Sequence, residues 1–330
     1  MNRQDEKHLP FDIDDIFKIQ SESDFNELAL ASFAYQLKNN TIYRSYCELI
    51  RVEKSTIDHY TKIPFLPISF FKTHHVVSFN GSAEETFLSS GTTGMTQSKH
   101  EVKHLSIYEK SFLKAFETRF GPIKDFVVFG LLPSYLQREG SSLIYMVDKF
   151  IQLSNHTESG FFLNDHETLA KKIKSVQNKK VLLIGVAYAL LDFGENHHPD
   201  LSNIMVMETG GMKGQRKELI KSELHDQLKK LFNVPTIYSE YGMTELLSQA
   251  YSIGTKFSCP AWMKVLTRSY TDPFCILENK SGGLNIIDLA NIYSCSFIAT
   301  QDLGRIHTDH FEVLGRFDNS DIRGCNLLVQ

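Results

Sequence analysis

The chain has 330 residues, of which 42% are hydrophobic and 22% charged, and its formal net charge is −4. This composition is typical of a globular protein with room for one large α/β domain or two modest ones, and it argues against a disordered chain. The lack of excess basic charge disfavours a nucleic-acid partner, and no stretch approaches the ~20 apolar residues that a membrane-spanning helix needs.

Residues 1–62 are predicted to form a helical N-terminal appendage. The first residues are polar and lack the apolar core of a secretory signal, which favours a cytoplasmic location. Asp24 and Glu27 form a predicted capping pair. The apolar residues of this segment keep helical spacing, at Phe25, Leu28, Ala29, Phe33 and Leu37. The prolines of residues 63–72 then exclude a regular helix and favour an extended segment across the body of the fold.

Residues 63–250 are predicted to form an α/β core. Amphipathic stretches alternate with short apolar runs, which are candidate strands at residues 126–129, 181–184, 204–207 and 236–238. Such alternation predicts a mostly parallel sheet with helices on both faces. One helix is expected to begin at Ser106, with a capping box to Glu109, and another to run from about Lys217 to Phe232.

The loops after the predicted strands are candidates for a binding crevice. In an open α/β sheet, ligands bind beyond the carboxyl ends of the strands. We therefore expect the loops at Ser89, Gly185, Glu208 and Ser239 to converge on one crevice.

Residues 251–330 change to short strands joined by turns. Candidate strands lie at residues 263–266, 274–277, 284–287 and 311–316, and Gly282-Gly283 is a predicted turn. This pattern is typical of antiparallel β structure. We expect a small barrel-like lobe against the parallel sheet.

A run of small hydroxyl and glycine residues, Ser89-Ser90-Gly91-Thr92-Thr93-Gly94, follows the apolar residues 86–88. This is typical of a strand that ends in a loop whose backbone N–H groups wrap a phosphate. A solvated turn is the alternative interpretation. On the phosphate interpretation, Lys99 is a candidate partner for the phosphate, although a solvated lysine is equally compatible with the sequence.

The pentad Tyr241-Gly242-Met243-Thr244-Glu245 lies further along the chain. It combines an aromatic face for a base, a hydroxyl for a phosphate oxygen and a carboxylate for Mg²⁺. The alternative is a helix start with Thr244 as its cap and Glu245 in the first turn. The joint occurrence of the two motifs predicts ATP chemistry.

In this order and at this separation, the two motifs resemble the phosphate loop and the adenine/Mg²⁺ motif of the adenylate-forming superfamily. That superfamily contains acyl-CoA synthetases, peptide-synthetase adenylation domains and luciferases. Residues 208–211 resemble its adenine-lining segment, residues 300–304 its ribose-binding aspartate motif, and residues 315–324 its hinge. The resemblance implies the N-terminal domain of an adenylate-forming enzyme, an α/β fold with a mostly parallel sheet flanked by helices and a C-terminal antiparallel β lobe.

The resemblance also implies roles for individual residues. The phosphates of ATP would be cradled by Ser89, Ser90, Gly91, Thr92, Thr93 and Gly94. Gly210 and Gly211 would approach adenine, Tyr241 with Gly242 would stack on it, and Thr244 would contact the α-phosphate. Glu245 would hold Mg²⁺, while Asp302 and Arg316 would reach the ribose. Lys213 and Arg216 would steady the α-phosphate or the substrate carboxylate, with a solvated basic helix start as the alternative.

A closer resemblance is to the acyl-protein synthetases of the bacterial bioluminescence fatty-acid reductase complex. It is carried by residues 65–67 and 210–214, by the late Cys325, and by the end of the sequence six residues after Gly324, from which we expect the C-terminal lid domain to be absent. Members of that family activate a fatty acid with ATP and carry the acyl group as a thioester on a cysteine near their C-terminus. Cys325 matches that position, and Arg323 favours its thiolate.

Three functional interpretations follow. The first is ATP-dependent activation of a carboxylic acid, as in a fatty-acid ligase, with transfer to Cys325; the second is transfer to coenzyme A, acyl carrier protein or another acceptor protein. The third is a non-catalytic nucleotide- or acyl-binding subunit. The remaining cysteines are expected to be inert core residues: Cys47, Cys259, Cys275 and Cys295. The histidine pairs 74/75, 197/198 and 100/104 lack a third metal ligand at a known spacing.

Overall fold

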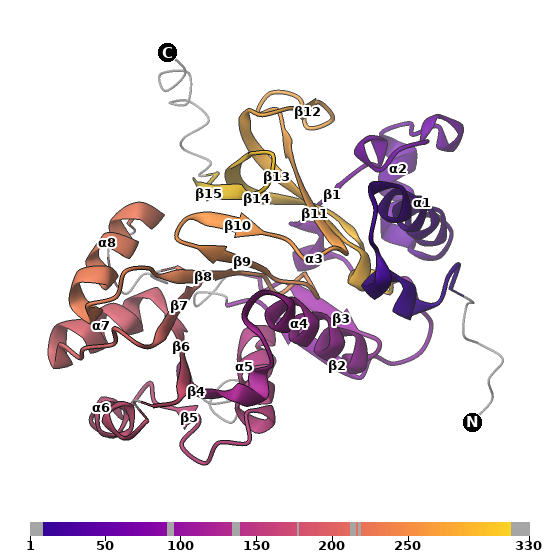
Figure 1. The fold of residues 1–330 in the computed structure, drawn as a ribbon. Coiled ribbons are helices and arrows are strands. Elements are labelled where there is room, and N and C mark those ends of the chain that lie inside the picture. The colour runs from indigo at the N-terminus through magenta and orange to yellow at the C-terminus, as the bar shows by residue number, and fades with distance from the viewer. Residues whose placement is uncertain are drawn as a thin grey trace.

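The structure is a computed structural model that describes residues 9–90, 96–133, 139–176, 178–211, 216 and 219–317. Its largest feature is a 13-stranded sheet in which twelve parallel and antiparallel strands follow one another along a single hydrogen-bonded path, while one short strand pairs beside that path. In Figure 1, helices α7 (Ala187–His197) and α8 (Lys221–Phe232) cover one side of the parallel part, while α4 (Leu105–Phe120) and α5 (Ser142–Leu153) lie on the other. The α/β prediction is confirmed.

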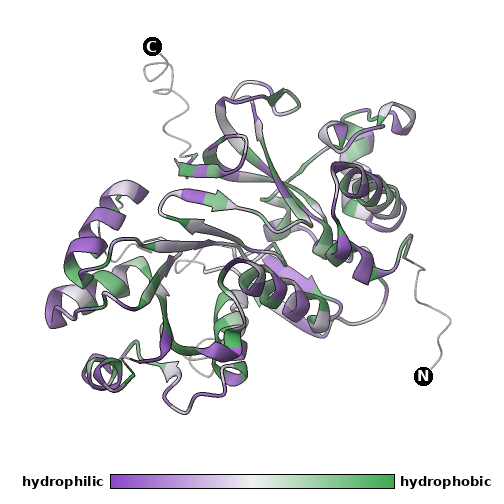
Figure 2. Ribbon diagram, in the orientation of Figure 1, coloured by the Kyte–Doolittle hydropathy of each residue, from purple (hydrophilic) through white to green (hydrophobic). Residues whose placement is uncertain are grey.

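The parallel part contains the predicted strands, with shifted ends. Its order is β8 (Tyr238–Tyr241), β7 (Met205–Thr209), β6 (Lys180–Val186), β4 (Phe126–Leu131) and β5 (Gly160–Phe161). All six residues of β4 are buried, because helices cover both faces of the sheet. Figure 2 shows this hydrophobic centre and the hydrophilic outer surface of α8. The shift that matters most is in β8, which includes Tyr241 instead of ending at residue 238.

The helix α4 begins one residue earlier than predicted and has a different cap. The backbone N–H of Leu105 donates to the carboxylate of Glu84 at 2.7 Å, so the predicted capping box from Ser106 to Glu109 is wrong. The helix ends at Phe120 and is followed by Gly121, whose φ of +93° favours glycine. Helix α6 (His166–Ser175) precedes β6, and α8 begins at Lys221, later than predicted.

The N-terminal segment is helical, as predicted, with α1 (Glu22–Asn39) and α2 (Thr41–Leu49). Its capping box joins Ser21 to Asp24, so the predicted pair with Glu27 is wrong. Strand β1 (Leu66–Pro67) is extended and pairs in parallel with β14 (Phe297–Ile306), but the extended segment ends there, because α3 (Phe70–Thr73) follows. Short 3-10 turns lie at Ile13–Lys18, Lys54–Thr56, Tyr60–Lys62, Ile123–Asp125 and Leu289–Asn291.

The antiparallel part extends the same sheet. It contains β9 (Ala250–Ile253), β10 (Lys256–Ser258), β11 (Met263–Arg268), β12 (Ile276–Leu277), β13 (Ser281–Asp288), β14 and β15 (Phe311–Arg316). Strand β9 pairs with β8, and β10 pairs with β15. The predicted turn at Gly282-Gly283 is wrong, because both glycines lie inside β13, where a Cβ on Gly282 would be 2.3 Å from the carbonyl oxygen of Arg268.

Three of the four loops expected at the crevice are not loops, because their residues lie in strands, and one of these residues is Ser239, a buried residue within β8. Gly185 lies within β6, where a Cβ would be 2.7 Å from Leu131 Cβ, and Glu208 lies within β7 with its side chain buried. A separate two-stranded sheet, β2 (Glu85–Leu88) and β3 (Lys99–Val102), carries the hydroxyl-rich motif. None of the helices in the described ranges is long and apolar enough to cross a bilayer.

Candidate active site

Ser89 and Ser90, the first two residues of the hydroxyl-rich motif, follow β2 in the β2–β3 hairpin. The backbone N–H of Ser98 donates to Ser89 Oγ at 2.8 Å, and the N–H of Ser89 donates to the carbonyl of Ser98 at 3.0 Å. These bonds tie the two ends of the turn together and leave Ser90 exposed. Lys99 is an exposed residue at the start of β3. Gly91, Thr92, Thr93 and Gly94 lie outside the described residues, so their phosphate-binding role stays a prediction.

The pentad of residues 241–245 begins at the end of β8 and continues as a turn, so the alternative of a helix capped by Thr244 is wrong. The Tyr241 ring is buried and stands edge-on to Phe257 and Phe311, with ring centroids 5.9 and 5.7 Å away. Its stacking on a base stays a prediction.

A buried histidine connects the hairpin to the pentad. His100, on β3, places Nδ1 2.7 Å from the carbonyl oxygen of Thr244 and Nε2 2.9 Å from Asn291 Oδ1. The amide of Asn291 in turn donates to the carbonyl of Glu245 at 2.8 Å. The backbone of the pentad is therefore fixed relative to the hairpin before any ligand binds. His104, four residues on, faces Glu84 instead, so these two histidines do not form a metal pair.

Asp302, Tyr241 and Arg316 form one hydrogen-bonded group. The hydroxyl of Tyr241 donates to Asp302 Oδ2 at 2.8 Å, and Arg316 Nε donates to Oδ1 at 3.0 Å. The carboxylate of Asp302 is nearly buried, whereas the side chain of Arg316 is 80% exposed. The structure thus brings together the residue expected at the base and the two residues expected at the ribose.

Glu245 is a buried carboxylate that makes no ion pair in the part of the chain that the structure describes. Burial raises its pKa, and a hydrogen bond from Ser98 opposes that effect. Because Ser98 also closes the hydroxyl-rich turn, this bond links the two motifs directly. A buried carboxylate without a paired cation fits the expected Mg²⁺, for which carboxylates are preferred ligands.

A cavity of about 140 Å³ lies between the two motifs. Ser90, Gly210, Gly242 and Thr244 all line it. Gly210 has a φ of +67°, a left-handed conformation that favours glycine in the loop after β7. Gly211 is the exposed residue beside it. Residues more than 100 positions apart in the sequence therefore meet at one polar cavity.

Two polar residues of this cavity were not predicted from the sequence. Glu240, in β8, is buried and accepts a hydrogen bond from Thr209 Oγ1 at 2.5 Å. Burial raises its pKa to about 7. Gln249 is also buried, and its Oε1 atom has no hydrogen-bond partner among the residues that the structure describes. A signal was present, because a glutamate inside an otherwise buried strand is unusual. The cavity thus offers an unpaired acceptor and a carboxyl group that titrates near neutrality.

The elevated pKa of Glu240 predicts that the protein loses stability as pH rises. The folded state binds this proton more tightly than the unfolded state, so the stabilisation is complete below about pH 4.5 and is lost through about pH 7. At ~1.36 kcal/mol per pKa unit, the loss is about 3 kcal/mol. We expect Glu240→Gln to remove this part of the fall in unfolding free energy between pH 5 and pH 8. Glu223→Gln, on an exposed face of α8, is the control and should show the same fall in unfolding free energy as wild type. Equal pH dependence in wild type and Glu240→Gln would show that Glu240 does not cause this fall.

Comparison with known proteins gives the family. A model described as "Acyl-protein synthetase, LuxE" matches residues 10–330. The chain belongs to this acyl-protein synthetase family. A comparison with curated protein sequences gave no match.

Solved structures show that the acyl-protein synthetase chain has the fold of adenylate-forming ligases. ATP-bound MatB from Rhodopseudomonas palustris is 15% identical with a TM-score of 0.54; the match covers 72% of this chain and 49% of MatB, so the chain spans about half the length of MatB. A 2-hydroxyisobutyryl-CoA ligase in complex with 2-HIB-AMP and CoA is 10% identical with a TM-score of 0.66, over 90% of this chain and 70% of the ligase.

The thiols of this family member differ in their surroundings. Cys47 and Cys295 are buried, and burial raises the pKa of Cys47 and of the partly buried Cys259 to about 12. Burial also raises the pKa of Cys295. Cys275 is exposed, so the expectation that all four are core residues is wrong for this one. Cys325 lies outside the described residues.

The basic residues expected near the α-phosphate are not placed there by the structure. Arg216 pairs with Asp192 and, at 2.6 Å, with Glu195. It is therefore already neutralised at the edge of α7. Lys213 lies outside the described residues, and its role in the synthetase stays a prediction.

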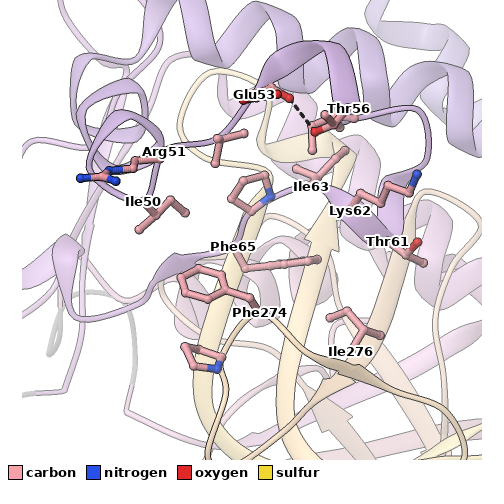
Figure 3. Close-up of a pocket in the computed structure, with 14 residues that line it drawn as sticks. Ile50, Arg51, Glu53, Thr56, Thr61, Lys62, Ile63, Phe65, Phe274 and Ile276 are labelled. Atoms are coloured by element: carbon pink, nitrogen blue, oxygen red, sulfur yellow. Dashed lines mark hydrogen bonds between the residues drawn. The ribbon is translucent and has the colours of Figure 1, made fainter.

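A larger cavity, of about 360 Å³, lies away from both motifs (Figure 3). It is formed between the end of α2 and the segment before β12, with Phe65, Phe274 and Ile276 among its lining residues. Arg51 and Lys62 lie at its edge, and Lys62 is paired with Asp58. None of the described residues of the two motifs lines it. We therefore place the candidate active site of the synthetase at the smaller cavity, where the motif residues meet.

Proposed function

We propose that the chain activates a carboxylic acid with ATP and transfers the acyl group to a thiol. The observation that carries this proposal is the meeting of Ser90, Gly210 and Thr244 at one cavity, with Glu245 tied to the hairpin by Ser98. The family and the fold agree with it. We place this activity in the cytoplasm, where ATP and reduced thiols are available.

The first step joins the acid to AMP. A carboxylate oxygen of the substrate attacks the α-phosphorus, and the bond between that phosphorus and the bridging oxygen breaks, so that pyrophosphate leaves. Ser89 and Ser90 bind the phosphates, Thr244 contacts the α-phosphate, and Asp302 accepts hydrogen bonds from the ribose hydroxyls beside Arg316. The hydrogen bonds that fix the pentad hold these groups in place, so catalysis rests on positioning and on neutralisation of phosphate charge.

Glu245 would hold Mg²⁺ in this step. The ion, when bound, would neutralise charge on the phosphate oxygens. Glu245 is suited to this role because its carboxylate is buried, hydrogen-bonded to Ser98 and not paired with a cationic side chain in the described ranges. We assign it the metal-binding and catalytic role predicted from the sequence.

The second step transfers the acyl group to sulfur. The Cys325 thiol loses its proton, and the thiolate attacks the carbonyl carbon of the acyl-AMP. A thioester forms as the bond to the AMP oxygen breaks. Lys213 would steady the substrate carboxylate or the α-phosphate before this transfer. Coenzyme A or an acyl carrier protein would accept the acyl group by the same chemistry, directly or after Cys325.

The cavity offers polar side chains to the acid that enters it. The cavity of about 140 Å³ is smaller than the ~300–1,000 Å³ of typical ligand pockets, and Glu240 and Gln249 line it. A fatty acid therefore needs space beyond this cavity for its chain. We propose a carboxylic acid, with fatty acids as the first class to test.

Exchange of labelled pyrophosphate into ATP tests the proposal, because it reports the first step alone. We expect exchange that depends on an added acid from a panel of fatty, short polar and aryl acids. Absence of exchange with the whole panel, by protein that binds ATP, would favour the non-catalytic binding subunit. Addition of coenzyme A or acyl carrier protein then shows whether either releases product.

We predict that Asp302→Asn lowers kcat/KM for ATP in the pyrophosphate exchange by about 10- to 100-fold. The substitution keeps the shape but removes the charge that accepts from Tyr241 and Arg316, and a hydrogen bond to a charged group contributes ~1.5–3 kcal/mol. Asp226→Asn, which loses only an exposed pair with Lys229, is the matched control and should exchange as wild type does. Equal kcat/KM in Asp302→Asn and wild type would show that Asp302 has no part in the binding of ATP.

A further inference from the structure

The turn that joins β14 to β15 gathers three side chains with metal-binding atoms. His307, His310 and Glu312 each place one such atom within 4.8 Å of the others. All three side chains are partly buried. This group lies at the opposite end of the hairpin from Asp302 and Arg316, which pair across the same two strands.

The backbone of the turn holds the two imidazoles together. The N–H of His307 donates to the carbonyl of His310 at 2.8 Å and closes the turn. The two rings are stacked, with centroids 4.4 Å apart and an interplanar angle of 9°. Glu312 follows in β15, and its Oε2 atom is 3.2 Å from His307 Nε2. The donors are therefore assembled by a tight hairpin and not by long, flexible loops.

Two neighbouring side chains orient these donors. The carboxylate of Asp309 lies 2.7 Å from His310 Nδ1, so that nitrogen carries the proton, and Nε2 is the ring atom that can accept a metal. The hydroxyl of Thr255 lies 3.4 Å from Glu312 Oε1. A histidine that donates one ring N–H to a carboxylate is the usual arrangement of a metal ligand.

We propose that His307, His310 and Glu312 bind one Zn²⁺ ion. Two imidazole nitrogens and one carboxylate oxygen are a ligand set that Zn²⁺ accepts, with solvent in the fourth position of a tetrahedron. Imidazole favours zinc over Mg²⁺ and Ca²⁺, which prefer oxygen ligands. The site is separate from the carboxylate expected to hold Mg²⁺, and its position at the turn gives it a structural role in closing the hairpin that carries Asp302 and Arg316.

The test is Zn²⁺ binding to the full chain, measured by competition with a chromogenic chelator. We expect one Zn²⁺ bound with Kd at or below about 1 μM, and a loss of at least 10-fold in affinity in His310→Ala and in Glu312→Gln. Asp309→Asn should weaken binding by about 10- to 100-fold, as is usual for a residue that orients a ligand. X-ray absorption of the zinc-loaded protein should show nitrogen and oxygen ligands without sulfur.

His75→Ala is the matched control, because it removes a histidine that pairs with Glu101 at 2.5 Å and lies outside the β14–β15 turn. It should bind Zn²⁺ as wild type does. The proposal is overturned if wild type binds no Zn²⁺ at 10-fold excess, if His310→Ala and Glu312→Gln bind as tightly as wild type, or if the absorption spectrum shows sulfur ligands. Far-UV circular dichroism of each variant separates loss of the site from loss of the fold.

Discussion

The Cys325→Ser protein should keep acid-dependent exchange of pyrophosphate into ATP and lose all covalent labelling by radioactive acid. Exchange needs only the first step, whereas the acid-stable, hydroxylamine-labile label reports a thioester on the protein. The described thiols at positions 47, 259 and 295 are poor alternatives, because burial raises the pKa of each one far above neutrality.

The competing acceptor is Cys275, the one exposed cysteine of the described ranges. Cys275→Ser is therefore the matched control and should be labelled as wild type is. Labelling that survives in Cys325→Ser but disappears in Cys275→Ser would identify Cys275, in the segment before β12, as the acyl acceptor. Exchange lost together with labelling in Cys325→Ser would instead give that residue a part in the first step.

Lys221→Met should lower the free energy of unfolding by about 3 kcal/mol. Lys221 Nζ contacts Glu208 Oε1 at 2.5 Å, and Glu208 is completely buried under α8. Burial raises the pKa of Glu208, but the charge of Lys221 and hydrogen bonds from His225 and Ser239 outweigh it and leave the pKa below its ordinary value. Removal of the lysine leaves a buried charge without its main partner, which costs ~3–5 kcal/mol.

Thermal unfolding measures this effect. For a chain of 330 residues, an entropy of unfolding of ~2.1 cal/mol/K per residue converts 3 kcal/mol into a Tm lower by about 4 °C. Lys229→Met is the control on the same helix, because its pair with Asp226 is exposed and contributes ~0–1 kcal/mol. The double variant Lys221→Met/Glu208→Gln should recover part of the loss. A Tm unchanged in Lys221→Met would show that Glu208 is not held by this ion pair.

The parallel sheet was predictable because its strands are continuous apolar runs. Strands β4, β6 and β7 all lie where hydrophobic residues cluster, since helices cover both faces. The motifs of the site were predictable for a different reason, which is that they combine several unusual residue types over a few positions. The meeting of Ser90 and Thr244 at one cavity follows from the order of the strands.

What could not be predicted depends on contacts between distant residues. The N–H of Leu105 at the start of α4 is capped by Glu84, which lies 21 positions earlier in the sequence. The local sequence pattern cannot show such a contact, and it indicated a capping box at Ser106 instead. The pKa of Glu240 is raised by its burial in the folded sheet, and this burial outweighs the opposing hydrogen bond from Thr209, 31 residues earlier. Gly282 of β13 is required by the backbone carbonyl of Arg268 on the neighbouring strand, and the guanidinium of the same arginine leaves little space for a side chain at Gly283.

The most direct measurement is a crystal structure with a non-hydrolysable acyl-sulfamate analogue of acyl-AMP. The ribose hydroxyls should lie within hydrogen-bond distance of Asp302, the base against Tyr241, and the sulfamate beside Thr244, with the start of the acyl chain in the cavity lined by Glu240. A well-ordered analogue bound elsewhere, for example in the cavity beside Phe65, with the pentad left without contacts, would contradict the account.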